Sequence, residues 1–480
     1  MDKTKIYGIA FDSAQSGGEE RMADAAGLQN DYVIGGSFQN GGRNDFDDAY
    51  PFGALRLCSV RMVNGEKTVT YENIDRSGKM GNVMVEIPKF YAKREKNGTR
   101  ERWLISGTCH EGFELEPCFR RGGQALDCVY VGVYNSEDRG DGVFSATGNV
   151  PDYDRTIGEF ERSYAAAGMD PYDLTIHQAL QKLMVIEFGT RFLKKHLGGI
   201  EALKYFSRLD AKKMIYETGP NRVSILNEKR GRHFVPGLEL GLGHREGDAS
   251  CRRRVTKTEV NPQHPEWVDI YYDGSDLSDV IHAYEDAAFG IPQRNGLTDG
   301  LHYHTGRCDL EAPLAPQMSY LCNPFRYRYI ENVWGNVWEY LSGLKVQHLK
   351  YYYTTEPERY GAELAAWQCA ETAVPEQHHL ANFDPHGAIW TSEFGQEAAE
   401  PTLLLPKTLV SGKIGALSDG VFYAFKDKNY GEKPVDPDIV YSAVTGGGFD
   451  HVFGSAFTYR CTILPATANW LYSDRVCLRK

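Results

Sequence analysis

The sequence lacks any long hydrophobic run. Its longest uninterrupted apolar stretches are about five residues, whereas a helix that crosses a membrane needs roughly 18. The N-terminal residues also contain no apolar core of the kind that a secretory signal peptide carries. We therefore expect a soluble globular protein with no membrane insertion and no signal peptide.

An excess of positive charge is also missing. The 480 residues include 53 Lys and Arg against 65 Asp and Glu, which gives a formal net charge of −12. Because binding to nucleic acid requires a cationic face that neutralises phosphates, we expect no nucleic-acid partner. The composition, with 41% apolar and 25% charged residues, is typical of a soluble globular protein.

Common metal and catalytic signatures are absent as well. The 10 cysteines include no Cys-x-x-Cys pair, so neither a zinc ribbon nor a thioredoxin-type motif is predicted. There is no Gly-x-Ser-x-Gly, no phosphate-binding Gly-x-x-x-x-Gly-Lys and no His-Glu-x-x-His. His302 and His304 alternate as strand residues do, but no third ligand follows at a recognisable spacing. We predict no cofactor, no metal site and no catalytic residue.

Glycine and tyrosine, by contrast, are abundant, with 50 and 29 residues, as expected for many turns and short strands. Asn64-Gly65 separates the runs Val60–Met62 and Thr68–Tyr71, and two-residue Asn-Gly loops suit the type I′ turns of β-hairpins. Apolar residues alternate along 83–91, which we interpret as one strand that leads to a second turn at Asn97-Gly98. The pattern predicts antiparallel hairpins.

Two segments instead have the period of a helix. From Ile176 to Phe188 the apolar residues fall on one helix face, Thr175 and Gln178 fit a capping box, and Gly189 is a plausible stop. A second helix is predicted from Ile200 to about Glu217. We expect both helices to pack in the core.

The rest of the chain suggests a scaffold with long insertions. Residues 218–315 are polar, rich in Gly and Pro and weakly periodic, which favours an insertion without an independent core. A second loop-rich stretch covers about 350–435, and a strand-rich block covers 440–480. We expect a β-rich N-terminal region at 1–75, a larger domain at 76–480, and no internal repeat.

Two motifs are more specific. The first runs from Ile330 to Tyr340 as Ile-Glu-Asn-Val-Trp-Gly-Asn-Val-Trp-Glu-Tyr, and the second begins at Thr445 with Thr-Gly-Gly-Gly-Phe and continues to Arg479. Large aromatic side chains in them suit apolar anchors, and glycines permit close approach and bending. We assign scaffold roles to Trp334, Gly335, Asn336, Trp338, Gly446, Gly447, Trp470 and Arg475.

These motifs resemble the C-type lectin fold in its formylglycine-generating-enzyme variety, which implies an α+β fold. Upstream blocks such as Val85–Tyr91, Gly112–Pro117 and Val129–Tyr134 are similar to those of phage tail and receptor-binding proteins, in the same order. Many such proteins are variable proteins of diversity-generating retroelements, which rewrite codons of a C-terminal region while the lectin scaffold stays fixed. The resemblance implies a homotrimer on a virion tail, made in the bacterial cytoplasm. It also implies an attachment or oligomerisation role for 1–75.

The resemblance places a variable ligand-binding region at 445–478. Its mixture of apolar, aromatic and charged residues without clean alternation favours an exposed binding surface over a strand packed on one face. Aromatic side chains there would supply contact area at a low cost in rotamer entropy. The predicted ligand-binding residues are Phe449, Asp450, His451, Val452, Phe453, Tyr459, Thr462, Ile463, Asn469 and Tyr472.

Three functions remain open on this fold. The favoured one is a non-enzymatic phage or prophage tail-tip protein that binds a host cell-surface protein or glycan and other tail proteins. An oxidase similar to the formylglycine-generating enzyme is less favoured, because that enzyme holds copper with a close cysteine pair. Here Cys461 and Cys477 lie 16 positions apart and Phe449–Arg460 contains no cysteine. The third is an invariant structural tail component.

Overall fold

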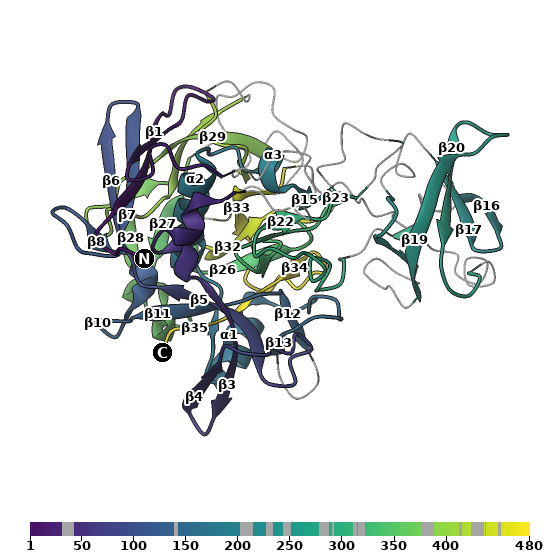
Figure 1. Cartoon of the computed structure of the whole chain (residues 1–480), viewed down its shortest axis with the longest axis horizontal. Coiled ribbons are helices and arrows are strands. Elements are labelled where there is room, and N and C mark those ends of the chain that lie inside the picture. The colour runs from purple at the N-terminus through teal and green to yellow at the C-terminus, as the bar shows by residue number, and fades with distance from the viewer. Residues whose placement is uncertain are drawn as a thin grey trace.

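The computed structural model describes most of the chain. The described residues are 1–30, 43–138, 143–201, 215–226, 234–242, 251–277, 288–289, 292–310, 314, 322–375, 388–411, 415–423, 436, 438–449 and 453–480. Strands dominate these residues, and three α-helices accompany them. The protein is therefore β-rich, and its sheets curl around a few helices (Figure 1).

The largest sheet has nine strands, all of which lie between residues 338 and 473 (Figure 1). Eight of them follow one another in the order β28 (Gln368–Ala373), β27 (Lys350–Tyr353), β26 (Trp338–Gln347), β32 (Tyr441–Gly446), β33 (Ser455–Ile463), β31 (Val421–Tyr423), β29 (Ala388–Phe394) and β30 (Pro406–Val410). The ninth, β34 (Tyr472–Ser473), pairs in parallel with β26. The predicted strand-rich block at 440–480 is thereby confirmed.

Two further sheets belong to the main body. A five-stranded sheet has the order β2 (Glu20–Ala23), β1 (Ile6–Asp12), β7 (Arg100–Ser106), β6 (Tyr91–Asn97) and β8 (Glu114–Leu115). A six-stranded sheet has the order β14 (Asp170–Pro171), β35 (Val476–Leu478), β11 (Cys128–Gly132), β5 (Asn82–Pro88), β3 (Arg56–Val63) and β4 (Glu66–Thr70). The last strand of the chain thus pairs with strands from its first half.

Several short sheets complete the body. They consist of β9 (Arg120–Arg121) with β10 (Gln124–Ala125), β12 (Ser136–Asp138) with β13 (Val143–Ser145), β15 (Gly199–Ile200) with β23 (Cys322–Asn323), and β22 (Gly306–Arg307) with β24 (Phe325–Tyr327) and β25 (Ile330–Glu331). Short 3-10 helices lie at Asp45–Asp48, Phe52–Ala54, Pro117–Phe119, Pro357–Arg359 and Leu364–Ala366.

Helix α2 (Leu174–Phe188) is buried along its whole length. It packs between β26 and β33 of the nine-stranded sheet and β1 and β7 of the five-stranded sheet. The predicted helix and its end at Gly189, which has φ 68°, are confirmed. The predicted capping box is wrong, because Asp173 is the N-cap and its carboxylate accepts from the backbone N–H groups of Thr175 and Ile176.

The other helices are α1 (Ile157–Ala166) and α3 (Lys194–Leu197). The predicted second helix from Ile200 to about Glu217 is wrong at both described ends, and residues 202–214 lie outside the described residues. Ile200 belongs to β15, and Ile215 begins β16 (Ile215–Gly219). Ile200 pairs with Cys322, far away in the sequence, whereas β16 pairs with the strand that directly follows it, so apolar spacing alone did not distinguish these strands from a helix.

Both predicted Asn-Gly hairpins form. β3 and β4 pair around Asn64-Gly65, and β6 and β7 pair around Asn97-Gly98. Residues 83–91 do not form one continuous strand, however. β5 ends at Pro88 and joins the six-stranded sheet, whereas β6 begins at Tyr91 and joins the five-stranded sheet.

The N-terminal 75 residues share the main core. β1 pairs with β7 over Ile6–Asp12, and β3 pairs with β5. Apolar side chains from these strands lie in the same buried cluster as those of α2 and the nine-stranded sheet. The expected boundary at residue 75 therefore does not coincide with a division of the core.

The two expected insertions have different structures. The first contains a six-stranded sheet in the order β16, β17 (Arg222–Leu226), β20 (Trp267–Tyr272), β19 (Cys251–Val260), β18 (Glu239–Leu242) and β21 (Ala288–Phe289). Contrary to expectation, it has a core of its own, which includes Val223, Ile225, Leu240 and Ile270. Most of this sheet lies at one end of the long axis of the molecule (Figure 1). The second, 350–435, contributes β27 to β31 to the nine-stranded sheet and is not an appendage.

Candidate functional site

The Ile330–Tyr340 motif forms a tight connection between β25 and β26. Trp334 is 1% exposed, its Nε1 donates to the carbonyl of Gly198 at 2.8 Å, and its ring lies 4.2 Å from that of Phe325. Gly335 has φ 78°, and a Cβ there would come within 2.9 Å of the backbone nitrogen of Ile200. The anchor and the close approach expected from the sequence are both present.

Asn336 connects this turn to two other segments. It has φ 61°, and its side chain accepts from the backbone N–H of Gln293 at 2.7 Å and donates to the Gln293 carbonyl at 3.1 Å. Its own carbonyl accepts from the N–H of Phe449 at 2.9 Å. Asn336 therefore positions the beginning of the predicted variable region.

Gly446 and Gly447 allow the chain to pass close to this anchor. Both have positive φ, 87° and 79°. A Cβ on Gly446 would lie 3.3 Å from the Cα of Trp334, and one on Gly447 would lie 2.6 Å from the Cα of Gly454. The loop that joins β32 to β33 is thus closed at its base by glycine contacts.

Glu339 and Arg475 join the two motifs in the interior. The Arg475 Nη2 atom lies 2.6 Å from Oε1 of Glu339, and both side chains are almost fully buried. Arg475 also donates to the carbonyls of Gly132 and Val133 at 3.0 and 2.8 Å. Burial raises the pKa of Glu339, and the adjacent guanidinium opposes that shift. This pair fastens the C-terminal strands to β26.

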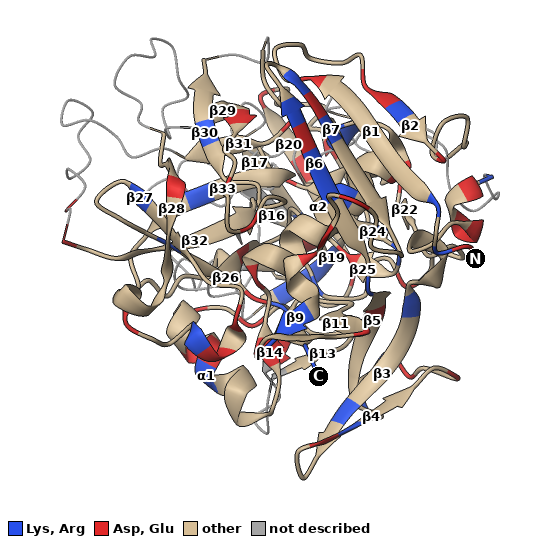
Figure 2. Ribbon diagram, turned by 90° about the vertical axis from the view of Figure 1, so that its left-hand side faces the viewer, with Lys and Arg blue, Asp and Glu red and all other residues tan. Residues whose placement is uncertain are grey.

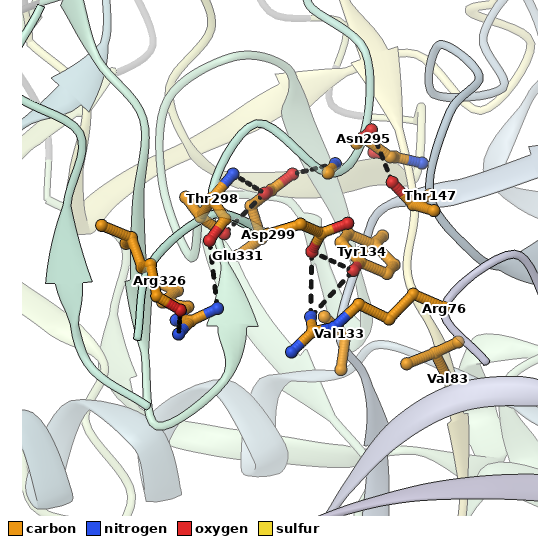
Figure 3. A network of polar contacts seen from close by, with 12 residues as sticks. Arg76, Val83, Val133, Tyr134, Thr147, Asn295, Thr298, Asp299, Arg326 and Glu331 are labelled. Carbon is orange, nitrogen blue, oxygen red and sulfur yellow. Dashed lines mark hydrogen bonds and ion pairs between the residues drawn. The ribbon is translucent and has the colours of Figure 1, made fainter. Parts of the chain in front are cut away.

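A second network orients the loop that lies beside the first motif (Figure 3). Glu331 accepts from the backbone N–H groups of Gly296 and Thr298, each at 2.8 Å, and from the Thr298 hydroxyl at 2.7 Å. Next to it, Arg76 donates to Asp299 at 2.9 Å. Because these groups satisfy one another, we assign the network a structural role.

Trp338 and Trp470 are buried in two different apolar clusters, Trp338 with residues of α1 and β26 and Trp470 with Ile200. Trp338 packs edge-on against Tyr423 with ring centres 5.4 Å apart, and Trp470 lies against Phe449 at 5.3 Å. Both tryptophans are at most 5% exposed. All eight residues assigned to the scaffold thus have interior positions.

Four predicted ligand-binding residues are buried, which corrects the expectation that they are exposed. They are Phe449, Tyr459, Ile463 and Tyr472, with exposures of 0 to 5%. Phe449 packs against Trp470, and the other three are buried because β33 is covered on both faces. On one face Tyr459 accepts from the side chain of Gln181 in α2, and on the other Ile463 and Tyr472 cluster with residues of α1 and β26. These four side chains have no accessible surface with which to bind a ligand.

The remaining predicted residues divide into two groups. Phe453, Thr462 and Asn469 are half-buried, although the Asn469 side chain is already engaged in a turn, where it accepts from the N–H of Leu471 at 2.9 Å. Asp450, His451 and Val452 lie outside the described residues. Among the described residues, fewer of the predicted ligand-binding side chains are accessible than expected.

Phe453 and Thr462 belong to a surface that sequence reasoning found only in part. The Phe453 ring meets Trp390 of β29 edge-on at 6.0 Å. Arg460 of β33 donates to the Thr462 hydroxyl at 3.2 Å, and its guanidinium lies 5.7 Å from the ring centre of Tyr423. Tyr423 belongs to the buried cluster against which Trp390 and Phe453 also pack. We call Trp390, Phe453, Arg460 and Thr462 the C-terminal patch. Trp390 and Arg460 were missed, since Trp390 lies in a stretch expected to be an insertion.

The patch has the chemistry of recognition. Its side chains supply aromatic faces, a guanidinium and a hydroxyl, which bind by stacking, cation–π contacts and hydrogen bonds. Burial raises the pKa values of the Cys461 and Cys477 thiols far above the ordinary thiol range. Within the described part of the chain, no three His, Cys, Asp or Glu side chains gather as a metal site would require.

Comparison with known proteins identifies no family. No protein-family model matches the sequence, and no curated protein matches it. In the described part of the chain, none of the helices combines the length and the apolar character needed to span a membrane.

Proposed function

We propose that this chain is a non-enzymatic ligand-binding protein that recognises its target through the C-terminal patch. The proposed scaffold is a C-type lectin fold of the formylglycine-generating-enzyme type, and the proposed setting is the tail tip of a phage or prophage. The target would be a host cell-surface protein or glycan. Attachment to other tail proteins, and assembly into a trimer, belong to the same proposal.

One observation carries the proposal: half-buried aromatic and cationic side chains lie on a sheet whose strands are held in place by buried contacts. Trp390 and Phe453 pack on each other at the surface, while Trp338 and the Glu339–Arg475 pair hold the underlying strands. A rigid scaffold that displays adaptable side chains favours recognition, because the binding groups lose little conformational entropy. Aromatic and arginine side chains also dominate the energetics of protein interfaces.

The order of the sequence motifs supports the same proposal. The Ile330–Tyr340 motif and the glycine run at 446–448 lie far apart in sequence, yet Asn336 and Phe449 are joined by a backbone hydrogen bond of 2.9 Å. Because this hydrogen bond holds the start of the loop, the residues that follow it can be substituted while the scaffold stays folded.

The proposal is tested by measuring how strongly the protein binds to whole bacterial cells. The cells are those of the candidate hosts, including relatives of the source microbe. Replacing Trp390 or Phe453 with alanine should reduce cell binding, measured by flow cytometry, by about tenfold or more, as for an interface hot spot. Tyr352→Ala is the matched control, because this half-buried aromatic lies on β27, near the edge of the same sheet opposite to β29. Equal binding by all three folded variants and the unmodified protein would refute the role of the patch.

A further inference from the structure

A cleft of about 350 Å³ lies where the six-stranded sheet of the first insertion meets the main body. One wall contains Glu239 of β18 together with Arg252 and Arg254 of β19, and the other wall is the loop at 294–297. Asp273, which follows β20, also lines the cleft. The volume lies at the lower end of the range of ligand pockets, which suits a ligand the size of a single small ring.

Consecutive arginines give the cleft a basic wall. Arg252, Arg253 and Arg254 follow one another in β19, and successive side chains of a strand point to opposite faces. Arg252 and Arg254 therefore share the face that lines the cleft, whereas Arg253 donates to the carbonyl and the hydroxyl of Ser275 outside it. On β6 and β7, by contrast, the basic residues are interspersed with glutamates (Figure 2). The run on β19 thus places two cations side by side at one cleft.

The carboxylates of the cleft do not neutralise its cations. Glu239 accepts from Arg252 at 3.0 Å and from Arg294 at 2.7 Å, so two guanidinium groups share one carboxylate. Asp273 accepts from the backbone N–H of Arg254 at 2.9 Å, and in the described part of the chain the Arg254 guanidinium has no ion-pair partner. Three guanidinium groups and two carboxylates therefore line the cleft, which leaves an excess of one positive charge.

Each of the three guanidinium groups also keeps N–H groups that could bind a ligand. Arg252 donates through Nη1 and Arg294 through Nε and Nη1, whereas Arg254 donates only through Nε, to the carbonyl of Gly237 at 3.3 Å. Within the residues that the structure describes, the Nη2 atom of each arginine has no protein acceptor. Both Nη atoms of Arg254 are available, and two such N–H groups match the two oxygens of a carboxylate.

The electrostatics of the cleft favour an anion with a single charge. Burial lowers the pKa of Arg252, the carboxylate of Glu239 opposes this shift, and the neighbouring Arg294 adds to it. An anion in the cleft would reduce the repulsion between these guanidinium groups. One negative charge matches the local excess, whereas a phosphate dianion would exceed it and would also be repelled by Glu239 and Asp273.

Asp273 adds an acceptor for hydroxyl groups. Its Oδ1 accepts from the backbone of Arg254, and among the described residues no group donates to its Oδ2. An ionised carboxylate can only accept hydrogen bonds, so a ligand that meets this oxygen must bring a donor. A small ring that carries both one carboxylate and several hydroxyl groups satisfies the cleft on all these counts.

We propose that this cleft binds an acidic sugar of the hexuronic acid class. The sugar carboxylate would pair with the Nη atoms of Arg254, and its hydroxyl groups would donate to Asp273 and accept from Arg252 and Arg294. The proposal does not rest on the C-terminal patch, so either site can fail without the other.

Ligand-observed NMR titration of the full-length protein tests the proposal with three probes: methyl glucuronide, methyl glucoside and glucose 6-phosphate. Methyl glucuronide should bind about tenfold more tightly than methyl glucoside, because only the glucuronide carries a carboxylate. Glucose 6-phosphate should bind more weakly than methyl glucuronide. Tighter binding of the phosphate would identify a phosphate site and would overturn the proposal.

Variants of two adjacent arginines separate the cleft from general effects of charge. Arg254→Gln should weaken the binding of methyl glucuronide about tenfold and leave that of methyl glucoside unchanged. Arg254→Lys should also weaken it, because lysine keeps the charge but loses the paired N–H groups. Arg253→Gln is the matched control on the other face of the same strand and should leave all three affinities unchanged.

Circular dichroism would confirm that each variant is folded. The proposal is overturned if the unmodified protein does not bind methyl glucuronide, if methyl glucoside binds equally well, or if Arg253→Gln weakens binding as much as Arg254→Gln.

Discussion

The guanidinium of Arg475 lies 2.6 Å from the carboxylate of Glu339, in an ion pair that is at most 2% exposed on either side. The two residues come from the two sequence motifs and are 136 positions apart. Asn135 also donates to Glu339, so three separate segments of the chain meet at this carboxylate. The two sequence motifs therefore meet at a buried polar anchor.

Removal of one partner of this pair should destabilise the protein strongly. Arg475→Met leaves the Glu339 carboxylate buried without its cation, and we expect the free energy of unfolding to fall by about 3–5 kcal/mol. Equilibrium denaturation in guanidinium chloride measures this change. The exposed pair Lys407–Glu393 is the control, and Lys407→Met should cost less than about 1 kcal/mol. A similar small loss for Arg475→Met would contradict the role of the pair as an anchor.

Alanine should be tolerated much less at Gly447 than at Gly98. Both glycines have positive φ, 79° and 63°, so both substitutions carry the same backbone strain. Only at Gly447 would the new Cβ clash with backbone, 2.6 Å from the Cα of Gly454, whereas Gly98 faces open space. We expect Gly447→Ala to cost about 1–3 kcal/mol more than Gly98→Ala in the same denaturation assay. Equal costs would show that the base of the loop is not tightly packed.

His177 should make the protein less stable in mild acid. Its imidazole is fully buried in α2 and hydrogen-bonds to the carbonyl of Ala456 and the hydroxyl of Tyr172, and burial lowers its pKa from 6.5 to about 4. The folded state therefore requires the neutral ring, and its stabilisation is present above pH 6.5 and lost as the pH falls toward 4. The effect amounts to about 3 kcal/mol.

His177→Gln, compared with the unmodified protein from pH 4 to pH 7, isolates this contribution. The variant should lack the loss of stability in acid, although it will be less stable at neutral pH. Glu201 acts in the opposite direction, because burial raises its pKa from 4.5 to about 7 and its contribution is lost as the pH rises through that range. If the two curves remain parallel, His177 is not the titrating group.

Local features of the fold were predictable because they depend on adjacent residues. The Asn64-Gly65 and Asn97-Gly98 turns and the end of α2 at Gly189 follow from the backbone freedom of these residues. The N-cap was not predicted, since Asp173 and Thr175 are both good capping residues. Only the structure shows that the Asp173 carboxylate reaches the free N–H groups.

The exposure of the candidate site was much less predictable. Tyr459 and Thr462 lie three residues apart in one strand, yet one is buried under α2 and the other is half-exposed. This difference depends on α1 and α2, which come about 300 residues earlier in the chain, and no local pattern contains it. Trp390 was missed for the same reason, because its place beside Phe453 follows from the pairing of β29 with β31.

The central claim is tested most directly by deep sequencing of codons 440–480 in a population of the source microbe or phage. The account predicts that substitutions concentrate at 450–453, Arg460, Thr462 and Asn469 and trace to adenines in a template. It predicts constancy at the buried residues Phe449, Tyr459, Ile463 and Tyr472. A uniform block across thousands of reads, or substitutions as frequent at these buried residues as at the patch, would contradict a diversified binding surface.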